Sequence, residues 1–247
     1  MKPANTPSSV DHTQPIGILL AAGRGSRFDP SGAHNKLLTT LPSGAEAGLP
    51  IAFVAARRMR NALPRVIAVV DGSPEMSAER AAQQRTLGDW LVKAGCEVVA
   101  SPRAHLGMGA SLADAVQASL RAAPGKPAAS TGSPSTTEAA DAPSAAAPVV
   151  PKGWVVALAD MPMIAPATTQ EVAAALLSAS DPLALVAPVH AGKRGHPAGF
   201  GAGRLDALLA LDGERGAGDW FGADGFVAVA TGDAGVLRDI DVPDDLR

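Results

Sequence analysis

The chain has 247 residues, 47% of them hydrophobic, which is enough apolar sequence for the core of one α/β domain. Its net charge of −3 and pI near 5.9 argue against a nucleic-acid-binding surface, which is normally strongly basic. A single cysteine excludes an internal disulfide, and no apolar run approaches the roughly 18 residues of a membrane helix. We therefore expect a cytoplasmic enzyme that binds neither nucleic acid nor membrane.

The first strand pattern leads into a glycine-rich turn. Residues 1–14 lack the apolar core of a signal peptide and predict a disordered tail, so the expected domain spans 15–247. The apolar run Ile16–Ala22 predicts a buried strand, and Gly23-Arg24-Gly25-Ser26-Arg27 follows it directly. Glycines let backbone N–H groups face a phosphate without a Cβ in the way. The arginines and the later Lys36 would supply positive charge for a triphosphate.

Two common phosphate loops do not fit this turn. A Walker A loop needs Ser or Thr after its lysine, whereas Lys36 precedes Leu37. A Rossmann fingerprint needs a small residue where Phe28 stands and an acid about 20 residues later. The first acid that ends a strand-like run is Asp71. The glycine spacing alone therefore leaves an ordinary tight turn as an alternative.

The next segments alternate between helix and strand patterns. A loop at 39–49 is followed by a helix from 50, whose apolar stripe is Ile51, Val54, Ala55 and Met59. A strand at 65–70, a helix at 77–94 and a strand at 97–100 come next. In the helix at 77–94, we expect Leu87, Trp90 and Leu91 to face inward. This order predicts a single Rossmann-like, three-layer α/β domain with a mostly parallel sheet. Ligands then bind at the carboxyl ends of the strands, where the glycine-rich turn lies.

A second glycine segment follows the third strand. Gly107 and Gly109 allow close backbone approach, and Ser111 could cap a helix that continues to residue 123. A flexible loop before a helix is the alternative, and we expect His105 to be an ordinary surface histidine.

Of the 28 residues at 124–151, 23 are Ala, Pro, Ser, Thr or Gly. This composition predicts a disordered insert within one domain.

The second half carries candidate metal ligands. A strand at 153–158 leads to Asp160, whose carboxylate could hold Mg²⁺ against a triphosphate; capping the helix near Pro166 is the alternative. A helix at 167–179 and a strand at 185–188 follow. The two cations and the histidine at 193–197 suit a ligand that bears a phosphate; the alternative is that this segment forms a tight hairpin. Short helices at 204–210 and 214–222 and a strand at 226–230 follow. Near the end, strand alternation would place Asp239 and Asp241 on one side, and either could be a second metal carboxylate.

In this order the segments resemble nucleotidyltransferases of the GT-A type, which share the nucleotide-diphospho-sugar transferase fold. The chain is most similar to molybdenum cofactor cytidylyltransferases and their guanylyltransferase relatives. The matching motifs are Leu20-Ala21-Ala22-Gly23-x-Gly25-x-Arg27 with Lys36, Gly107-Met108-x-x-Ser111-Leu112, Asp160-Met161-Pro162, Arg194-Gly195-His196-Pro197 and Asp239-Ile240-Asp241. The last motif departs from the family in having Val242 for Thr and Asp244 for Glu.

The resemblance implies Mg²⁺-dependent transfer of CMP from CTP to a molybdopterin-type cofactor, with release of pyrophosphate. It assigns catalysis to Arg27, Lys36 and Asp160, the acceptor to Arg194, Gly195, His196 and Pro197, and the metal to Asp160 with Asp239 or Asp241. The nucleotide would contact Leu20, Ala21, Ala22, Gly23, Arg24, Gly25, Ser26, Arg27, Lys36, Gly107, Met108 and Ser111. Three alternatives stay open: another nucleotide such as GTP, another phosphorylated acceptor such as a sugar phosphate, and a non-catalytic accessory protein that delivers the cofactor to a molybdoenzyme.

Overall fold

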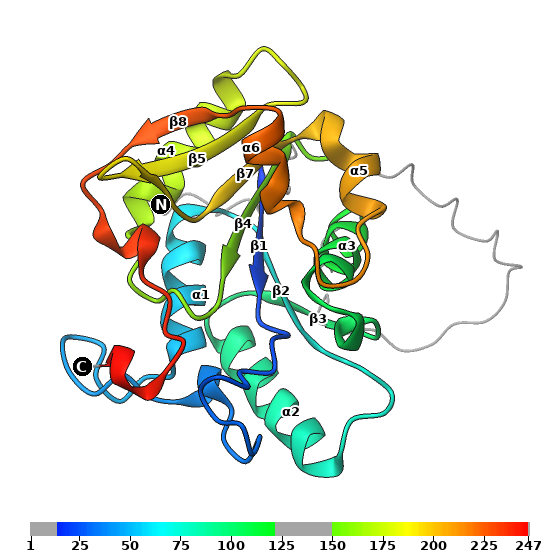
Figure 1. Cartoon of the computed structure of the whole chain (residues 1–247), viewed down its shortest axis with the longest axis vertical. Helices are drawn as coiled ribbons and strands as arrows, with labels where there is room; N and C mark the ends of the chain where they lie inside the picture. The colour runs from blue at the N-terminus through cyan, green and yellow to red at the C-terminus, as the bar shows by residue number, and fades with distance from the viewer. Residues whose placement is uncertain (1–13, 122–149, 247) are drawn as a thin grey trace, which may run out of the picture.

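A mixed sheet of eight strands forms the centre of the computed structural model, which describes residues 14–121 and 150–246 (Figure 1). The strands are β1 Ile16–Leu20, β2 Val66–Asp71, β3 Glu97–Ser101, β4 Gly153–Leu158, β5 Leu185–His190, β6 Lys193–Arg194, β7 Ala198–Gly201 and β8 Val227–Ala230. The α-helices are α1 Ile51–Ala62, α2 Ala78–Lys93, α3 Met108–Ser119, α4 Pro166–Ser178, α5 Leu205–Leu209 and α6 Trp220–Ala223.

The sheet has a parallel half and an antiparallel half. Its order is β3-β2-β1-β4-β7-β5-β6, and β8 pairs with β5. The first four strands in this order are mutually parallel, and β8 is parallel to β5. The pairs β4–β7, β5–β7 and β5–β6 are antiparallel, because the chain turns back in short connections after β5. The carboxyl ends of β1 to β4 therefore meet at one edge, as the predicted α/β fold requires.

Helices cover both faces of the sheet and enclose two hydrophobic cores. Successive strand side chains point to opposite faces, so in β1 Leu19 belongs to one core and Ile18 to the other. Helices α1, α2 and α4 pack on the first face, and α3, α5 and α6 pack on the second (Figure 1). Central β1 is apolar throughout because both of its faces are covered. The three-layer prediction is confirmed.

The predicted helix stripes agree with the packing. All four stripe residues of α1 are buried, and its first residue follows Pro50, which caps the helix in an extended conformation. In α2, Leu87 and Leu91 are fully buried, while Trp90 is half-buried and its ring meets Phe53 edge to face with 5.3 Å between centroids. Among the described residues, no helix is long and apolar enough to cross a membrane.

Three local predictions are wrong. Ser111 is not a helix cap: α3 begins at Met108, and the Ser111 hydroxyl donates back to the Gly107 carbonyl one turn earlier. The segment around Asp239 and Asp241 is not a strand, since it lies between two 3-10 helices, Ala234–Leu237 and Pro243–Leu246. The helix expected at 214–222 starts later, as the 3-10 turn Ala217–Asp219 followed by α6. The predicted tail and most of the predicted insert lie outside the described residues.

Candidate active site

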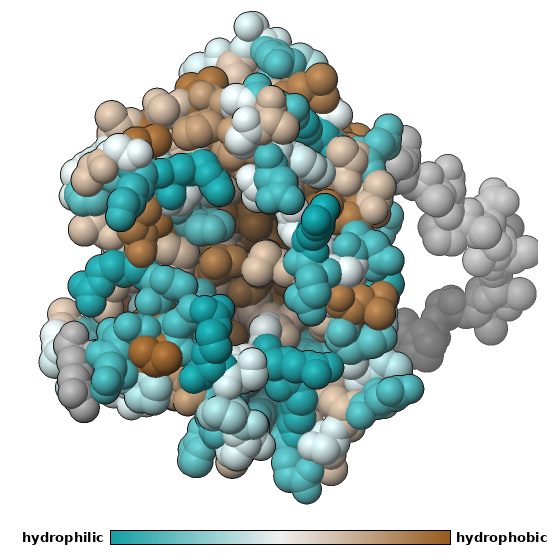
Figure 2. Space-filling model, in the orientation of Figure 1, coloured by the Kyte–Doolittle hydropathy of each residue, from teal (hydrophilic) through white to brown (hydrophobic). Residues whose placement is uncertain are grey.

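A cavity of about 430 Å³ opens at the carboxyl edge of the parallel strands. Figure 2 shows this face hollowed near its centre, where a hydrophobic floor is framed by hydrophilic residues. The cavity is lined by Leu20, Ala22, Gly23, Arg24, Gly25, Ser26, Arg27, Lys36, Leu37, Ala104, His105, Gly107, Met108, Ser111, Leu158, Asp160, Glu214 and Asp241. Its volume lies in the range usual for small-molecule sites.

The glycine-rich turn forms one wall of the cavity. It leaves the end of β1 and closes with a hydrogen bond from Phe28 N to the Gly25 carbonyl, 2.9 Å long. Gly25 has a φ of +63°, and a side chain there would also press on Lys36, whose Cβ would be 3.3 Å away. Both the backbone conformation and the close approach of the lysine therefore favour glycine at this position.

Four charged side chains from distant parts of the chain meet beside this turn. Lys36 is buried, and its Nζ lies 2.7 Å from Asp160 Oδ2 and 3.3 Å from Asp241 Oδ1. Arg27 forms an ion pair with the other oxygen of Asp241. A lysine is rarely buried unless carboxylates neutralise it, so the cluster is a mutually dependent set of two cations and two anions.

The carboxylates of this cluster fit a divalent metal. Asp160 Oδ1 is buried and has no hydrogen-bond partner among the described residues. A buried carboxylate oxygen without a partner is costly, and a bound cation would satisfy it. No group of three or more His, Cys, Asp or Glu gathers in the described ranges. Mg²⁺ needs only one or two carboxylates when phosphate oxygens and water complete its shell, so Asp160 and Asp241 suit Mg²⁺ held together with a nucleotide.

Of the two C-terminal acids, only Asp241 reaches the cavity. Ile240 is buried, and its N–H donates to the Asp160 carbonyl at 3.0 Å, which ties this segment to the end of β4. Asp245 accepts hydrogen bonds from the N–H groups of Asp241 and Val242 and fixes the next turn. Asp239 is exposed and does not line the cavity. Sequence alternation could not choose between the acids, because the segment is irregular.

The other end of the cavity is walled by the 3-10 helix Ala104–Leu106 and the start of α3. Gly107 has a φ of +133°, and a side chain there would stand 2.5 Å from Glu214 Cα. Gly109 N donates to the Gly213 carbonyl at 2.9 Å. Both glycines therefore allow the loop at 212–215 to pack against this wall. The sequence predicted a close approach at these glycines but not which segment approaches them. It also did not predict five residues that line the cavity, namely Leu37, Ala104, His105, Leu158 and Glu214.

Two predicted groups do not line the cavity. Ala21 points into the core beside β2, although its neighbours on both sides face the cavity. The four residues Arg194, Gly195, His196 and Pro197 form the end of the β5–β6 hairpin and the turn that follows it. Gly195 lies against Val236, whose carbonyl accepts the His196 N–H at 2.9 Å. The hairpin alternative is thus present, and the acceptor role stays a prediction.

His196 nevertheless lies close enough to the charged cluster for the charge of Asp160 to affect its pKa. Burial and the positive charge of Arg194 lower the pKa of His196. A hydrogen bond to the Val156 backbone and the negative charges of Asp160 and Asp239 act to raise this pKa, but their effect is smaller. Its Nδ1 is buried and has no partner among the described residues. Burial and Arg194 therefore favour the neutral form of this imidazole.

Comparison with known proteins gives one family and a common fold. The family described as "MobA-like NTP transferase domain" matches residues 17–228. No protein with a curated description matches the sequence significantly.

Solved structures of similar architecture include Rv0371c from Mycobacterium tuberculosis H37Rv, with a TM-score of 0.61, 22% identity and coverage of 95% of this chain and 96% of that one. A structure of Rv0371c in complex with manganese has a TM-score of 0.59, 21% identity and coverage of 94% and 96%. A nucleotidyl transferase from Methanothermobacter thermautotroptrophicus has a TM-score of 0.63, 20% identity and coverage of 94% of each chain.

Proposed function

The chain belongs to the MobA-like NTP transferase domain family, and from this premise we propose that it transfers CMP from CTP to a molybdopterin-type cofactor with release of pyrophosphate. Membership makes the chain a nucleotidyltransferase; the nucleotide, the acceptor and the metal are the proposal. The observation that supports nucleotidyl transfer at this site is the cluster of Lys36, Asp160, Asp241 and Arg27 at the end of the glycine-rich turn.

The proposed chemistry is in-line displacement at the α-phosphorus. A terminal phosphate oxygen of the acceptor forms the new bond to this phosphorus, and the bond to the bridging oxygen of the β-phosphate breaks. Lys36, Arg27 and the amides of the turn would hold the leaving pyrophosphate, because they line the same wall of the cavity. A nucleotide would draw the two cations from the carboxylates that they contact in this structure. Positioning and electrostatic stabilisation then supply most of the rate enhancement.

The chain would hold the metal through Asp160 and Asp241. When bound there, Mg²⁺ supplies positive charge next to the reacting phosphate. The unpartnered Oδ1 of Asp160 supports this assignment, and the Rv0371c complex contains manganese, a divalent ion of similar preference. The hairpin residues Arg194 to Pro197 would contact the acceptor from outside the nucleotide cavity. The product would then pass to a molybdoenzyme in the cytoplasm.

The choice of CTP rests on the turn sequence. Relatives that use GTP resemble Leu-Ala-Gly-Gly, whereas this chain has Leu20-Ala21-Ala22-Gly23, and Ala22 lines the cavity. With the base lying against Ala22, its methyl group would reduce the room for a purine and leave a pyrimidine unhindered.

Pyrophosphate release from each of the four NTPs, with and without purified molybdenum cofactor, tests the proposal. We expect release to require CTP, Mg²⁺ and the cofactor. Faster release with GTP would overturn the cytidylyl assignment, and release that needs a sugar phosphate would overturn the acceptor. Tight binding of the cofactor with no turnover of any NTP would instead favour the accessory-protein alternative.

A further inference from the structure

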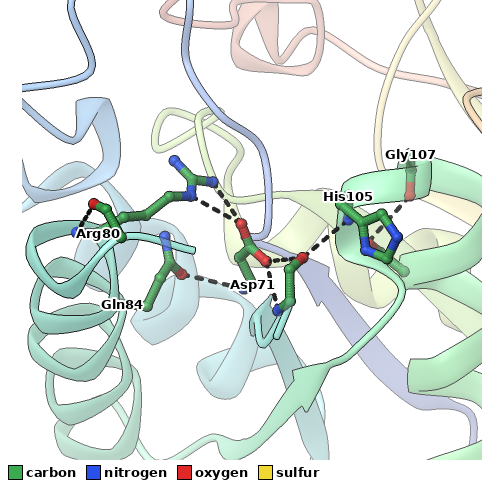
Figure 3. A network of polar contacts seen from close by, with 8 residues as sticks. Asp71, Arg80, Gln84, His105 and Gly107 are labelled. Atoms are coloured by element: carbon green, nitrogen blue, oxygen red, sulfur yellow. Dashed lines mark hydrogen bonds and ion pairs between the residues drawn. The ribbon is translucent and has the colours of Figure 1, made fainter. Parts of the chain in front are cut away.

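A buried polar network stands behind the cavity wall formed by residues 104–108. Asp71 ends β2, and its side chain is only 4% exposed. Its Oδ2 accepts from Arg80 Nε at 2.9 Å and Nη2 at 2.7 Å, and its backbone N–H donates to Gln84 Oε1 at 3.1 Å (Figure 3). Asp71 is therefore held from the α2 side by two residues of that helix.

The other oxygen of Asp71 orients Ser73. Asp71 Oδ1 accepts from the Ser73 N–H at 2.9 Å and from the Ser73 hydroxyl at 2.5 Å. Burial would raise the pKa of Asp71, but the hydrogen bonds from Ser73 and Arg80 outweigh burial and hold this pKa below its usual range. A hydroxyl has one proton, and that proton is committed to Asp71. Its lone pairs are then free to accept, and they receive the backbone N–H of His105 at 3.1 Å.

This last bond reaches the cavity wall itself. Ala104 and His105 both line the cavity, and Figure 3 shows His105 across the network from Arg80. None of the residues Ala104–Leu106 is buried, so apolar packing does little to fix them. Arg103 and Ser101 on the preceding side contact Asp114 of α3. The position of the wall therefore depends on polar contacts from two sides.

We propose that Asp71 and Ser73 are positioning residues that hold the base-side wall of the nucleotide cavity in its binding position. The inference rests on the proposed function, because it places the phosphates at the turn of Gly23 to Arg27 and the base between Ala22 and the wall of residues 104–108. Among the hydrogen bonds described, the network reaches the cavity only at the base-side wall and does not contact the turn of Gly23 to Arg27. Loss of the network should therefore weaken binding of a whole nucleotide and leave binding of pyrophosphate unchanged.

Ser73→Ala is the sharpest test, because it removes both hydroxyl hydrogen bonds and almost no volume. We expect the calorimetric Kd for CTP with Mg²⁺ to rise about 3- to 10-fold, the effect of one lost hydrogen bond. The Kd for pyrophosphate with Mg²⁺ should not change. In turnover, KM for CTP should rise while kcat at saturation stays near that of the wild type. Ser73→Thr keeps the hydroxyl and should restore the wild-type Kd.

Ser77→Ala is the matched control. Ser77 caps α2 through the Arg80 N–H at 3.3 Å and makes no described contact with residues 104–106. It should lower the melting temperature without changing either Kd. Equal weakening of CTP and pyrophosphate by Ser73→Ala, or no weakening at all, would overturn the positioning role. A wild type that binds no NTP would instead remove the proposed function, so the two failures are distinguishable.

Discussion

At the scale of single residues, the site is a balance of charges that a ligand would reorganise. Lys36 is buried only because Asp160 and Asp241 neutralise it, and Arg27 neutralises the second oxygen of Asp241. One oxygen stays outside this balance, the buried Oδ1 of Asp160. A bound cation would pair with this oxygen and remove the cost of leaving it unsatisfied.

The first prediction concerns that carboxylate. Asp160→Asn should lower kcat/KM by roughly 100-fold or more, since it removes the charge that would hold Mg²⁺ while keeping the volume. Asp241 still neutralises Lys36 and the amide oxygen can still accept from it, so the melting temperature should change by no more than about 4 °C. Mg²⁺-dependent pyrophosphate release and thermal unfolding measure the two effects.

Asp239→Asn is the control for this substitution. Asp239 is exposed and outside the cavity lining, so its variant should keep near wild-type activity and Mg²⁺ dependence. If the two variants lost activity equally, Asp241 would not be the second ligand. If Asp160→Asn kept its activity, the metal site would lie elsewhere.

The second prediction concerns nucleotide choice. Ala22→Gly should reduce the preference for CTP over GTP without inverting it, because Ala22 lines the cavity with one methyl group. One methyl group discriminates by about 1–3 kcal/mol, roughly 10- to 200-fold, so the opposite wall must supply the rest. The measurement is kcat/KM for both nucleotides in the wild type and the variant. An unchanged ratio would show that Ala22 does not contribute to selectivity.

At the scale of elements, the start of α3 is placed by its contact with a distant loop. Gly107 and Gly109 let the backbone of 212–215 pack directly on the helix, and the hydrogen bond from Gly109 N to the Gly213 carbonyl fixes the alignment. The loop thereby braces the same wall that Ser73 holds from the other side. The shape of the cavity is thus set by two elements that contribute few residues to its lining.

Gly109→Ala tests this bracing. Its Cβ would collide with the Arg215 carbonyl oxygen, so the helix or the loop must move. We expect a loss of about 1–3 kcal/mol in the free energy of unfolding, together with weaker binding of CTP. Gly88→Ala is the control, because a Cβ there would meet only Val98 at an ordinary 3.7 Å. That variant should gain up to about 1 kcal/mol from helix propensity. Similar effects of both variants would contradict the bracing.

At the scale of the whole molecule, the candidate site is assembled from both ends of the sequence. The turn after β1, the end of β4 and the C-terminal segment meet because β1 and β4 are adjacent parallel strands in the sheet. The hydrogen bond from Ile240 N to the Asp160 carbonyl returns the C-terminal segment to this point and brings Asp241 into the cavity. The lysine and its two carboxylates therefore meet only when β1 pairs with β4 and the C-terminal segment returns to the end of β4.

The last prediction concerns the segment between α3 and β4. Replacing residues 125–149 by a short Gly-Ser linker should leave kcat and the melting temperature nearly unchanged, since their composition lacks the large apolar side chains of a core. The closure entropy of a flexible loop changes by only about 0.6 kcal/mol for each doubling of its length. Thermal unfolding and pyrophosphate release measure the outcome. A large fall in either would show that this segment packs on the domain or covers the cavity.

The sequence by itself determined the parallel half of the sheet and the edge at which the candidate site lies. Runs such as Ile16–Leu20 and Gly153–Leu158 are strands because their apolar pattern is local, and the helices between them make the strands parallel. The turn of Gly23 to Arg27 and Asp160 follow these strands directly, so their place at the carboxyl edge was predictable. The glycines at 107 and 109 likewise predicted a close approach.

Only the tertiary structure decided which distant groups meet. Lys36 is 124 residues from Asp160 and 205 from Asp241, and no local pattern specifies such pairs. The choice of Asp241 over Asp239, the packing of 212–215 on α3 and the bond from Ser73 to His105 are of the same kind. The physical reason is that periodicity and turn chemistry act over a few residues. Contacts between loops depend on how the finished sheet and its two helical layers bring their ends together.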